Sequence, residues 1–182
     1  KKLHIDVLVP RVVLIVETGK EKDNTAMELL GSMYSPQSGD FITAVDESNV
    51  IVSKSLDPGE GYEAVEQTAN TIVDMMNTEA MMNVRVAYGT IVQELKDVSK
   101  SYKEASMALD VGKIFYVEKK VNAYGRLGIG RLIYQLPVNL CKIYIDEIFG
   151  ENDPSDFDEE TITTVNKFFE NNLNVSETSR QL

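Results

Sequence analysis

The feature that most constrains the fold is an uninterrupted apolar run near the N-terminus, "RVVLIVE" at residues 11–17. Its side chains are mostly β-branched, and such residues favour strands over helices. A strand with one solvated face would alternate apolar and polar residues, whereas this run has no alternation. The run therefore predicts a strand that is buried on both faces.

The segments that follow alternate between helix and strand patterns. The predicted order is strand 11–17, helix 23–34, strands 41–45 and 50–54, helix 62–80, strand 83–89, helix 95–112 and strand 121–124. The first helix has Asp23 or Asn24 as its expected N-cap, and the third ends at Gly112 as a C-cap. The two strands before residue 55 flank the four turn-forming residues "DESN", which predicts a β-hairpin.

After about Gly130 the pattern becomes entirely helical. The segments "RLIYQL", "LCKIYIDEIF" and "ETITTVNKFFENNL" each have helical spacing of apolar residues. We therefore expect an α+β fold, with a mixed sheet flanked by helices, followed by a small all-helical C-terminal segment. The expected domains are residues 1–128 and 129–182.

Composition limits the function classes. The net charge is −11, so the residues present should repel a phosphate backbone on average. No apolar run is long enough to cross a bilayer, and the single cysteine, Cys141, suits a reducing cytoplasm. Because Cys141 lies in the apolar stretch "LCKIYI", we expect it to be an ordinary buried side chain.

No segment has the pattern of a catalytic or ligand-binding motif. The acidic stretch "ENDPSDFDEE" lacks the spacing of a Ca²⁺ loop, and "GRLGIG" lacks the Lys-Ser/Thr of a phosphate loop. They are interpreted as a solvated linker and as a turn between strand and helix. His4, the only histidine, has no partner for a metal site or a triad. We therefore expect no catalytic, metal-binding or cofactor-binding residue.

Several stretches together resemble a known family. "LHIDVLVPRVVLIVE", "SYKEASMALDVGK" and "YGRLGIGRL", followed by "FFENNLNVSETSRQL", are similar in order and spacing to bacterial transcriptional regulators of the PucR and sugar-diacid-regulator (CdaR-like) type. The resemblance covers nearly the whole chain. It implies a GGDEF-like, ferredoxin-like-derived regulatory domain that couples an N-terminal sensor to a C-terminal helix-turn-helix.

The resemblance also implies where DNA would be contacted. Residues 159–173 match the helix that leads into the DNA-binding unit, and residues 176–182 match the first helix of that unit. Ser176, Ser179 and Arg180 are then the candidate DNA-binding residues, with the recognition helix expected beyond Leu182. The implied partners are DNA in the full-length protein but not in this chain, a second copy in a homo-oligomer, and an unknown small-molecule effector. No membrane partner is implied, and the location is cytoplasmic.

The GGDEF resemblance raises the alternative of a nucleotide cyclase. That chemistry needs carboxylates that hold Mg²⁺ and a glycine turn that lets the phosphates approach the backbone. Glu17, Asp46 and Glu47 could supply carboxylates, but the hairpin turn "DESN" has no glycine pair. We therefore expect a catalytically inactive regulatory domain. A nucleotide- or small-molecule-binding domain is the alternative, and an active diguanylate cyclase is the least favoured.

Overall fold

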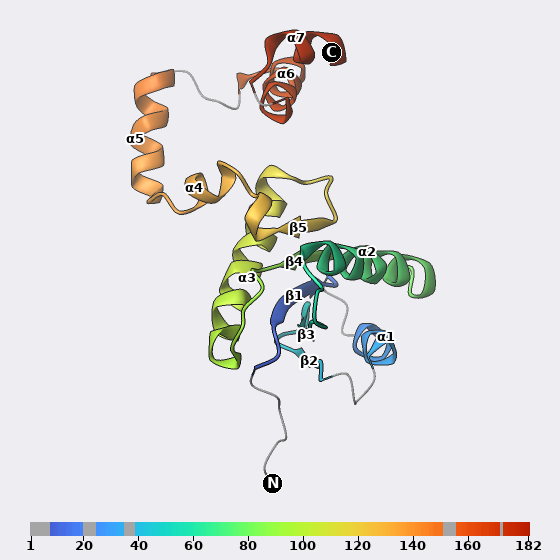
Figure 1. Cartoon of the computed structure of the whole chain (residues 1–182). Helices are drawn as coiled ribbons and strands as arrows, with labels where there is room; N and C mark the ends of the chain where they lie inside the picture. The colour runs from blue at the N-terminus through green and yellow to red at the C-terminus, as the bar shows by residue number, and fades with distance from the viewer. Residues whose placement is uncertain (1–7, 20–24, 35–38, 151–155, 172) are drawn as a thin grey trace. The chain divides into compact units, whose positions relative to one another are not determined.

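The computed structural model describes residues 8–19, 25–34, 39–150, 156–171 and 173–182. It divides into two compact units, residues 1–135 and 136–182. The predicted boundary after residue 128 lies within the first unit, because helix α4 (Gly130–Tyr134) packs against helix α3 (Val98–Phe115). The expected α+β class, a mixed sheet with helices, is confirmed (Figure 1).

The strands of the first unit form one mixed sheet in the order β2-β3-β1-β4-β5 among the described residues. They are β1 (Arg11–Glu17), β2 (Phe41–Ala44), β3 (Asn49–Ser55), β4 (Arg85–Tyr88) and β5 (Val121–Ala123). The central β1 pairs antiparallel with β3 and β4, and β4 pairs parallel with β5. The predicted hairpin is confirmed, because β2 pairs antiparallel with β3.

Helices cover both faces of this sheet, with α1 (Thr25–Met33) and α2 (Tyr62–Glu79) on one side and α3 on the other (Figure 1). The side chains of β1 alternate between the two layers. Val12, Leu14 and Val16 belong to the core under α1 and α2, and Val13 and Ile15 belong to the core under α3. The prediction that residues 11–17 are buried on both faces is confirmed. Each such aliphatic side chain contributes roughly 1.5–3 kcal/mol by burial.

Helix α3 does not end where the sequence predicted. It continues through Gly112 to Phe115, so Gly112 is not its C-cap. A Cβ atom at Gly112 would lie 2.5 Å from the side-chain nitrogen of Asn122, a buried residue of β5. The glycine is therefore explained by the close approach of β5 to the helix rather than by a helix end. The expected N-cap of α1, Asp23 or Asn24, lies outside the described residues.

The glycine-rich segment "GRLGIG" connects β5 to α4, as predicted for a turn. It contains a short 3-10 helix, η2 (Tyr124–Arg126), and Gly128 adopts a positive φ of 52°. The hydroxyl of Tyr116 donates to the carbonyl of the buried Leu127 at 2.9 Å. This contact fixes the turn against the end of α3. A second 3-10 helix, η1 (Leu95–Asp97), leads into α3.

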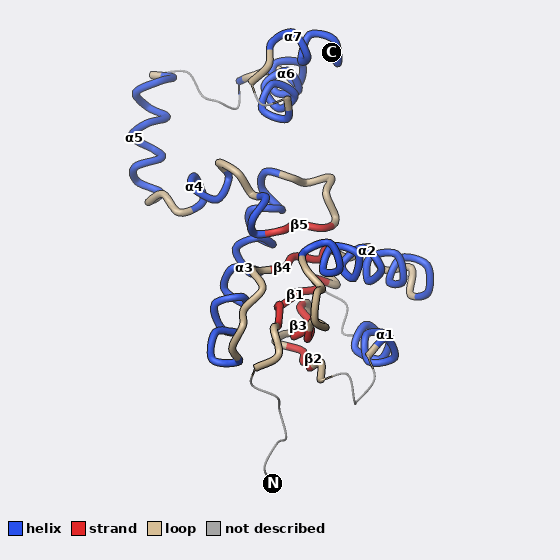
Figure 2. The backbone as a smooth tube through the Cα atoms, in the orientation of Figure 1, coloured by secondary structure: helices blue, strands red, loops and turns tan. Residues whose placement is uncertain are grey.

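The second unit is helical in its described residues, as expected (Figure 2). Its helices are α5 (Val138–Phe149), α6 (Glu159–Glu170) and α7 (Val175–Gln181). Asp158 caps α6 by accepting from Thr161 N at 2.7 Å, and Asn174 caps α7 by accepting from Glu177 N at 3.1 Å. None of the helices in the described ranges is long and apolar enough to span a lipid bilayer.

The expected burial of Cys141 is wrong. The thiol lies on α5 and is only partly buried, because no residue of that helix is buried. The apolar residues around it do form a helix, as their spacing predicted. A stripe of apolar residues indicates which face of a helix avoids water and does not identify the surface that covers it.

Candidate functional site

The end of β1 lies beside the hairpin turn that the resemblance singled out. In the sheet register Glu17 is opposite Asn49 on one side and Arg85 on the other. The N–H and hydroxyl of Thr18 both donate to the carbonyl oxygen of Ser48, at 2.8 and 3.2 Å. The sheet therefore brings the first-strand carboxylate and the "DESN" turn into one neighbourhood, as a metal-dependent site would need.

The carboxylate of Asp46 is bound by its own turn. Its Oδ1 accepts hydrogen bonds from the N–H of Ser48 at 2.7 Å and from the N–H of Asn49 at 2.8 Å. The Asn49 side chain donates to both carboxylate oxygens, at 3.1 and 2.9 Å. These bonds, that of the Asn49 side chain foremost, lower the pKa of Asp46. Asp46 therefore stabilises a glycine-free turn through local hydrogen bonds from its side chain to the backbone, which aspartate commonly makes in turns.

The carboxylate of Glu17 pairs with a cation from α3, the helix that covers one face of the sheet. Residues of β1 alternate in direction, so Glu17 shares the α3 face with Val13 and Ile15. Lys113 Nζ of α3 lies 2.9 Å from Glu17 Oε1, and this hydrogen bond is the main cause of the raised pKa of Lys113. Sequence reasoning missed this pair, because the two residues are 96 positions apart and no local pattern connects them.

A second carboxylate extends this cluster. Asp110 lies 3.4 Å from Lys113 Nζ and accepts a hydrogen bond from the hydroxyl of Tyr134 on α4 at 2.9 Å. That bond raises the pKa of Tyr134. The cluster ties β1, α3 and α4 together, and its lysine partly neutralises both acids.

The carboxylates at this edge of the sheet do not converge on a common point. Asp46 bonds within the turn, Glu17 bonds to α3, and Glu47 is exposed in the turn. Within the described ranges no group of three or more His, Cys, Asp or Glu side chains could hold a metal ion. The predicted candidate carboxylates are thus neighbours in the fold without forming a metal centre. His4 lies outside the described residues.

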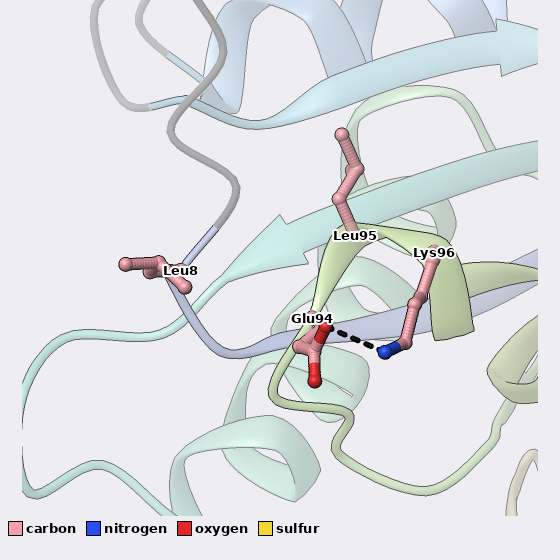
Figure 3. A pocket seen from close by; sticks show the side chains of 4 residues that line it. All are labelled: Leu8, Glu94, Leu95 and Lys96. Carbon is pink, nitrogen blue, oxygen red and sulfur yellow. Dashed lines mark ion pairs between the residues drawn. The ribbon is translucent and has the colours of Figure 1, made fainter.

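Two surface hollows in the first unit are lined by charged side chains. One, of about 400 Å³, is lined by Leu8, Glu94, Leu95 and Lys96 (Figure 3). In Figure 3 the two leucine side chains point away from each other, and Lys96 Nζ meets Glu94 Oε2 at 2.8 Å. Because these two charges neutralise each other, the hollow offers no convergent polar groups for a ligand.

The second hollow, of about 300 Å³, lies along α3. It is lined by Ser99, Lys100, Lys103, Glu104, Met107 and Tyr124. The carboxylate of Glu104 is already used, because Thr90 donates to it through both its N–H, at 2.8 Å, and its hydroxyl. The two lysines and the tyrosine ring give this surface a positive and aromatic character. Sequence reasoning missed it, since η2 and α3 meet only in the fold.

The candidate DNA-binding residues lie together on α7. Ser176 and Ser179 are exposed, and the spacing of Ser176, Ser179 and Arg180 places all three on one side of the helix. Arg180 Nη1 lies 3.0 Å from Glu177 Oε2, so its charge is partly neutralised within the helix. Thr178 is buried and accepts a long hydrogen bond from Asn171 at 3.4 Å, which fixes α7 against α6.

Comparison with known proteins identifies the N-terminal three fifths of the chain. The family model described as "GGDEF-like domain" matches residues 1–111. The matched residues include β1 to β4 and most of α3, and so contain both Glu17 and the "DESN" turn. No curated protein gives a significant match to the chain.

Proposed function

The chain belongs to the GGDEF-like domain family, and from this premise we propose that it is the catalytically inactive regulatory core of a PucR-type bacterial transcriptional regulator. In this role the domain couples an upstream sensor to a DNA-binding helix-turn-helix. The observation that supports inactivity is that two of the carboxylates that could hold Mg²⁺ already have other partners. Asp46 is bonded within its turn, and Glu17 is paired with Lys113.

The hairpin turn, which would have to bind the phosphates of a nucleotide, supports the same proposal. A triphosphate held close to a turn needs backbone N–H groups that no side chain obstructs, and glycine provides them. The turn of this chain consists of Asp46, Glu47, Ser48 and Asn49, and the N–H groups of Ser48 and Asn49 already donate to Asp46. Two backbone donors of the turn that could bind an anion are therefore occupied by an acidic side chain.

Incubation with GTP and Mg²⁺, followed by chromatography of the nucleotides, tests this part of the proposal. We expect no turnover above a control without protein. The variant Lys113→Ala, which releases Glu17 from its cation, should also be inactive, because the turn still lacks its glycines. Formation of a cyclic dinucleotide by the wild-type chain would contradict the assignment.

DNA binding is proposed for the full-length regulator and not for these residues alone. The chain has a net charge of −11, and Arg180 is paired with Glu177. Affinity for DNA rests on several neutralised phosphates acting together, which one paired arginine cannot provide. In a helix-turn-helix the second helix reads the bases, and we place that helix beyond Leu182.

A gel-shift experiment on the regulator's own promoter at moderate salt tests this placement. The chain ending at Leu182 should bind negligibly, and a version extended by several dozen residues of its natural sequence should bind specifically. Equal binding by both would place the DNA-reading surface within the present residues and would contradict the proposal.

A second candidate function is the binding of an anionic small molecule without turnover. The observation that favours it is the hollow along α3, where Lys100 and Lys103 lie near the ring of Tyr124. Thermal-shift titration with GTP and with inorganic phosphate tests it. A stabilisation that is lost in Lys100→Gln/Lys103→Gln would support an effector site there, and no shift at millimolar concentration would contradict it.

A further inference from the structure

Side-chain contacts hold helix α4 to the rest of the first unit. Its five residues are too few for a helix that is stable in water by itself, so its position depends on what it touches. It packs closely on α3 at Gly130, where a Cβ atom would lie 3.1 Å from a side-chain carbon of that helix. The guanidinium of Arg131 lies 4.9 Å from the ring centre of Tyr124. The hydroxyl of Tyr134 donates to Asp110 Oδ2 on α3 at 2.9 Å.

The contact of Tyr134 is one end of a longer polar network. Asp110 uses its other oxygen, Oδ1, for Lys113, whose Nζ lies 3.4 Å away. The same Nζ lies 2.9 Å from Glu17 Oε1 at the end of β1. One ammonium group is thus shared between two carboxylates on different elements, and its shorter contact is with Glu17. The network runs from the sheet through α3 to α4.

We propose that Lys113 couples the end of β1 to α4 by dividing its charge between Glu17 and Asp110. Because the ammonium group has two alternative partners, it is an element with two positions that both ends of the network can bias. Loss of the Glu17 charge, by substitution or by pairing with a cationic group of a partner, leaves Asp110 as the remaining carboxylate partner of Lys113 among the described residues. The ammonium group then moves onto Asp110 and neutralises it.

The sign of the coupling follows from the charge of the hydrogen-bond acceptor. Hydrogen bonds to charged groups are stronger than those to neutral groups, so a neutralised Asp110 is a weaker acceptor for the Tyr134 hydroxyl. The pKa of Tyr134 reflects both influences, because the hydrogen bond to Asp110 is the main cause of its rise and the charge of Lys113 opposes it. Loss of the Glu17 charge should therefore loosen α4, and loss of the Lys113 charge should hold it more tightly.

This inference rests on the proposed regulatory function, because it names the residues that carry the coupling. Helix α4 is the last element of the first unit, and the chain continues from it into the helical unit. A change at the end of β1 would thereby reach the segment that connects the two units. The coupling is tested on the present chain without nucleotide or DNA, so its failure is distinguishable from failure of the proposed function.

Amide hydrogen exchange at Ile133, whose N–H donates to the carbonyl of Ile129 at 3.0 Å, measures local opening of α4. We expect exchange about twofold faster in Glu17→Gln and about twofold slower in Lys113→Gln, the size of effect typical of an exposed ion pair. The double variant Glu17→Gln/Lys113→Gln should match Lys113→Gln alone, because Glu17 acts through the lysine. Glu94→Gln, which removes another carboxylate paired with a lysine, is the matched control and should change nothing at Ile133.

Titration of the Tyr134 hydroxyl by carbon NMR of labelled tyrosine gives a second measure, with Tyr134→Phe identifying its signal. Lys113→Gln should raise the pKa of Tyr134, and Glu17→Gln should lower it. If Lys113→Gln also speeds exchange at Ile133, or if Glu17→Gln has the same effect with and without the lysine, the coupling is wrong. Neither result bears on catalytic inactivity or on DNA binding by the longer protein, which the nucleotide and gel-shift experiments decide.

Discussion

At the scale of single residues, the ion pair between Lys113 and Glu17 is the contact most open to measurement. The hydrogen bond from Glu17 raises the pKa of Lys113 in the folded chain above its ordinary value of 10.5. The stabilisation from this pair is therefore fully present below about pH 10 and is lost as the pH rises through the folded pKa. Because the lysine side chain is 40% exposed, the pair contributes only about 0.2–1 kcal/mol.

We expect Lys113→Gln to lower the free energy of unfolding at neutral pH by that amount and to reduce the loss of stability at alkaline pH. Denaturant titrations of both proteins at pH 7 and pH 11 measure the two effects. Lys96→Gln, which removes the more exposed pair with Glu94, is the control. If the free energies of unfolding of wild type and Lys113→Gln differ by the same amount at both pH values, this account is wrong.

Gly89 is expected to tolerate no side chain. It directly follows β4, and a Cβ atom there would overlap the backbone carbonyl of Ser101 on α3. Ser101 is fully buried, and its hydroxyl accepts a hydrogen bond from Val13 N at 2.9 Å, so the helix cannot easily move away. Gly89→Ala should destabilise the fold by roughly 1–3 kcal/mol through overpacking.

Thermal unfolding of Gly89→Ala and of Gly125→Ala measures this constraint. Gly125 has open space around its missing Cβ, so its substitution should leave the melting temperature almost unchanged. If the two variants have the same melting temperature, the contact between Gly89 and α3 leaves room for a side chain and this account is wrong.

At the scale of elements, the start of α7 depends on one side chain. Asn174 Oδ1 accepts from the N–H of Glu177, which would otherwise lack a partner at the helix N-terminus. Asn174→Ala should cost about 0.5–2 kcal/mol of local helix stability, and Asn174→Asp should retain most of the cap. Amide hydrogen exchange at Glu177 measures this local stability in each variant. Equal protection in both variants would show that the cap is dispensable.

The elements also show what the sequence could and could not predict. The apolar run of β1, the "DESN" hairpin and the stripe of α2 are local patterns, and each was predicted at nearly its observed place. The end of α3 was not predicted correctly. Position 112 requires a glycine because the side chain of Asn122 lies against it, and not because the helix ends there. The pairing of Glu17 with Lys113 joins residues 96 positions apart, which no spacing rule connects.

At the scale of the whole molecule, residues 1–135 have a core of their own. The buried clusters on the two faces of the sheet consist entirely of residues from this unit. A chain of residues 1–135 should therefore fold alone and unfold cooperatively. Its amide NMR spectrum should match the corresponding signals of the complete chain. Collapsed, poorly dispersed signals would show that the helical unit is needed for folding.

The position of β1 in the sheet has a consequence for how the protein is made. On both sides β1 pairs with strands that are synthesised later, since Leu14 lies opposite Val52 of β3 and Tyr88 of β4. At 5–20 residues per second, a ribosome needs roughly 4–15 s to extend the chain from β1 to β4. During that interval the most apolar segment of the nascent chain lacks one of its neighbours. Chaperones that bind extended apolar segments would find "VVLIV" accessible then, and would lose it once β4 has formed.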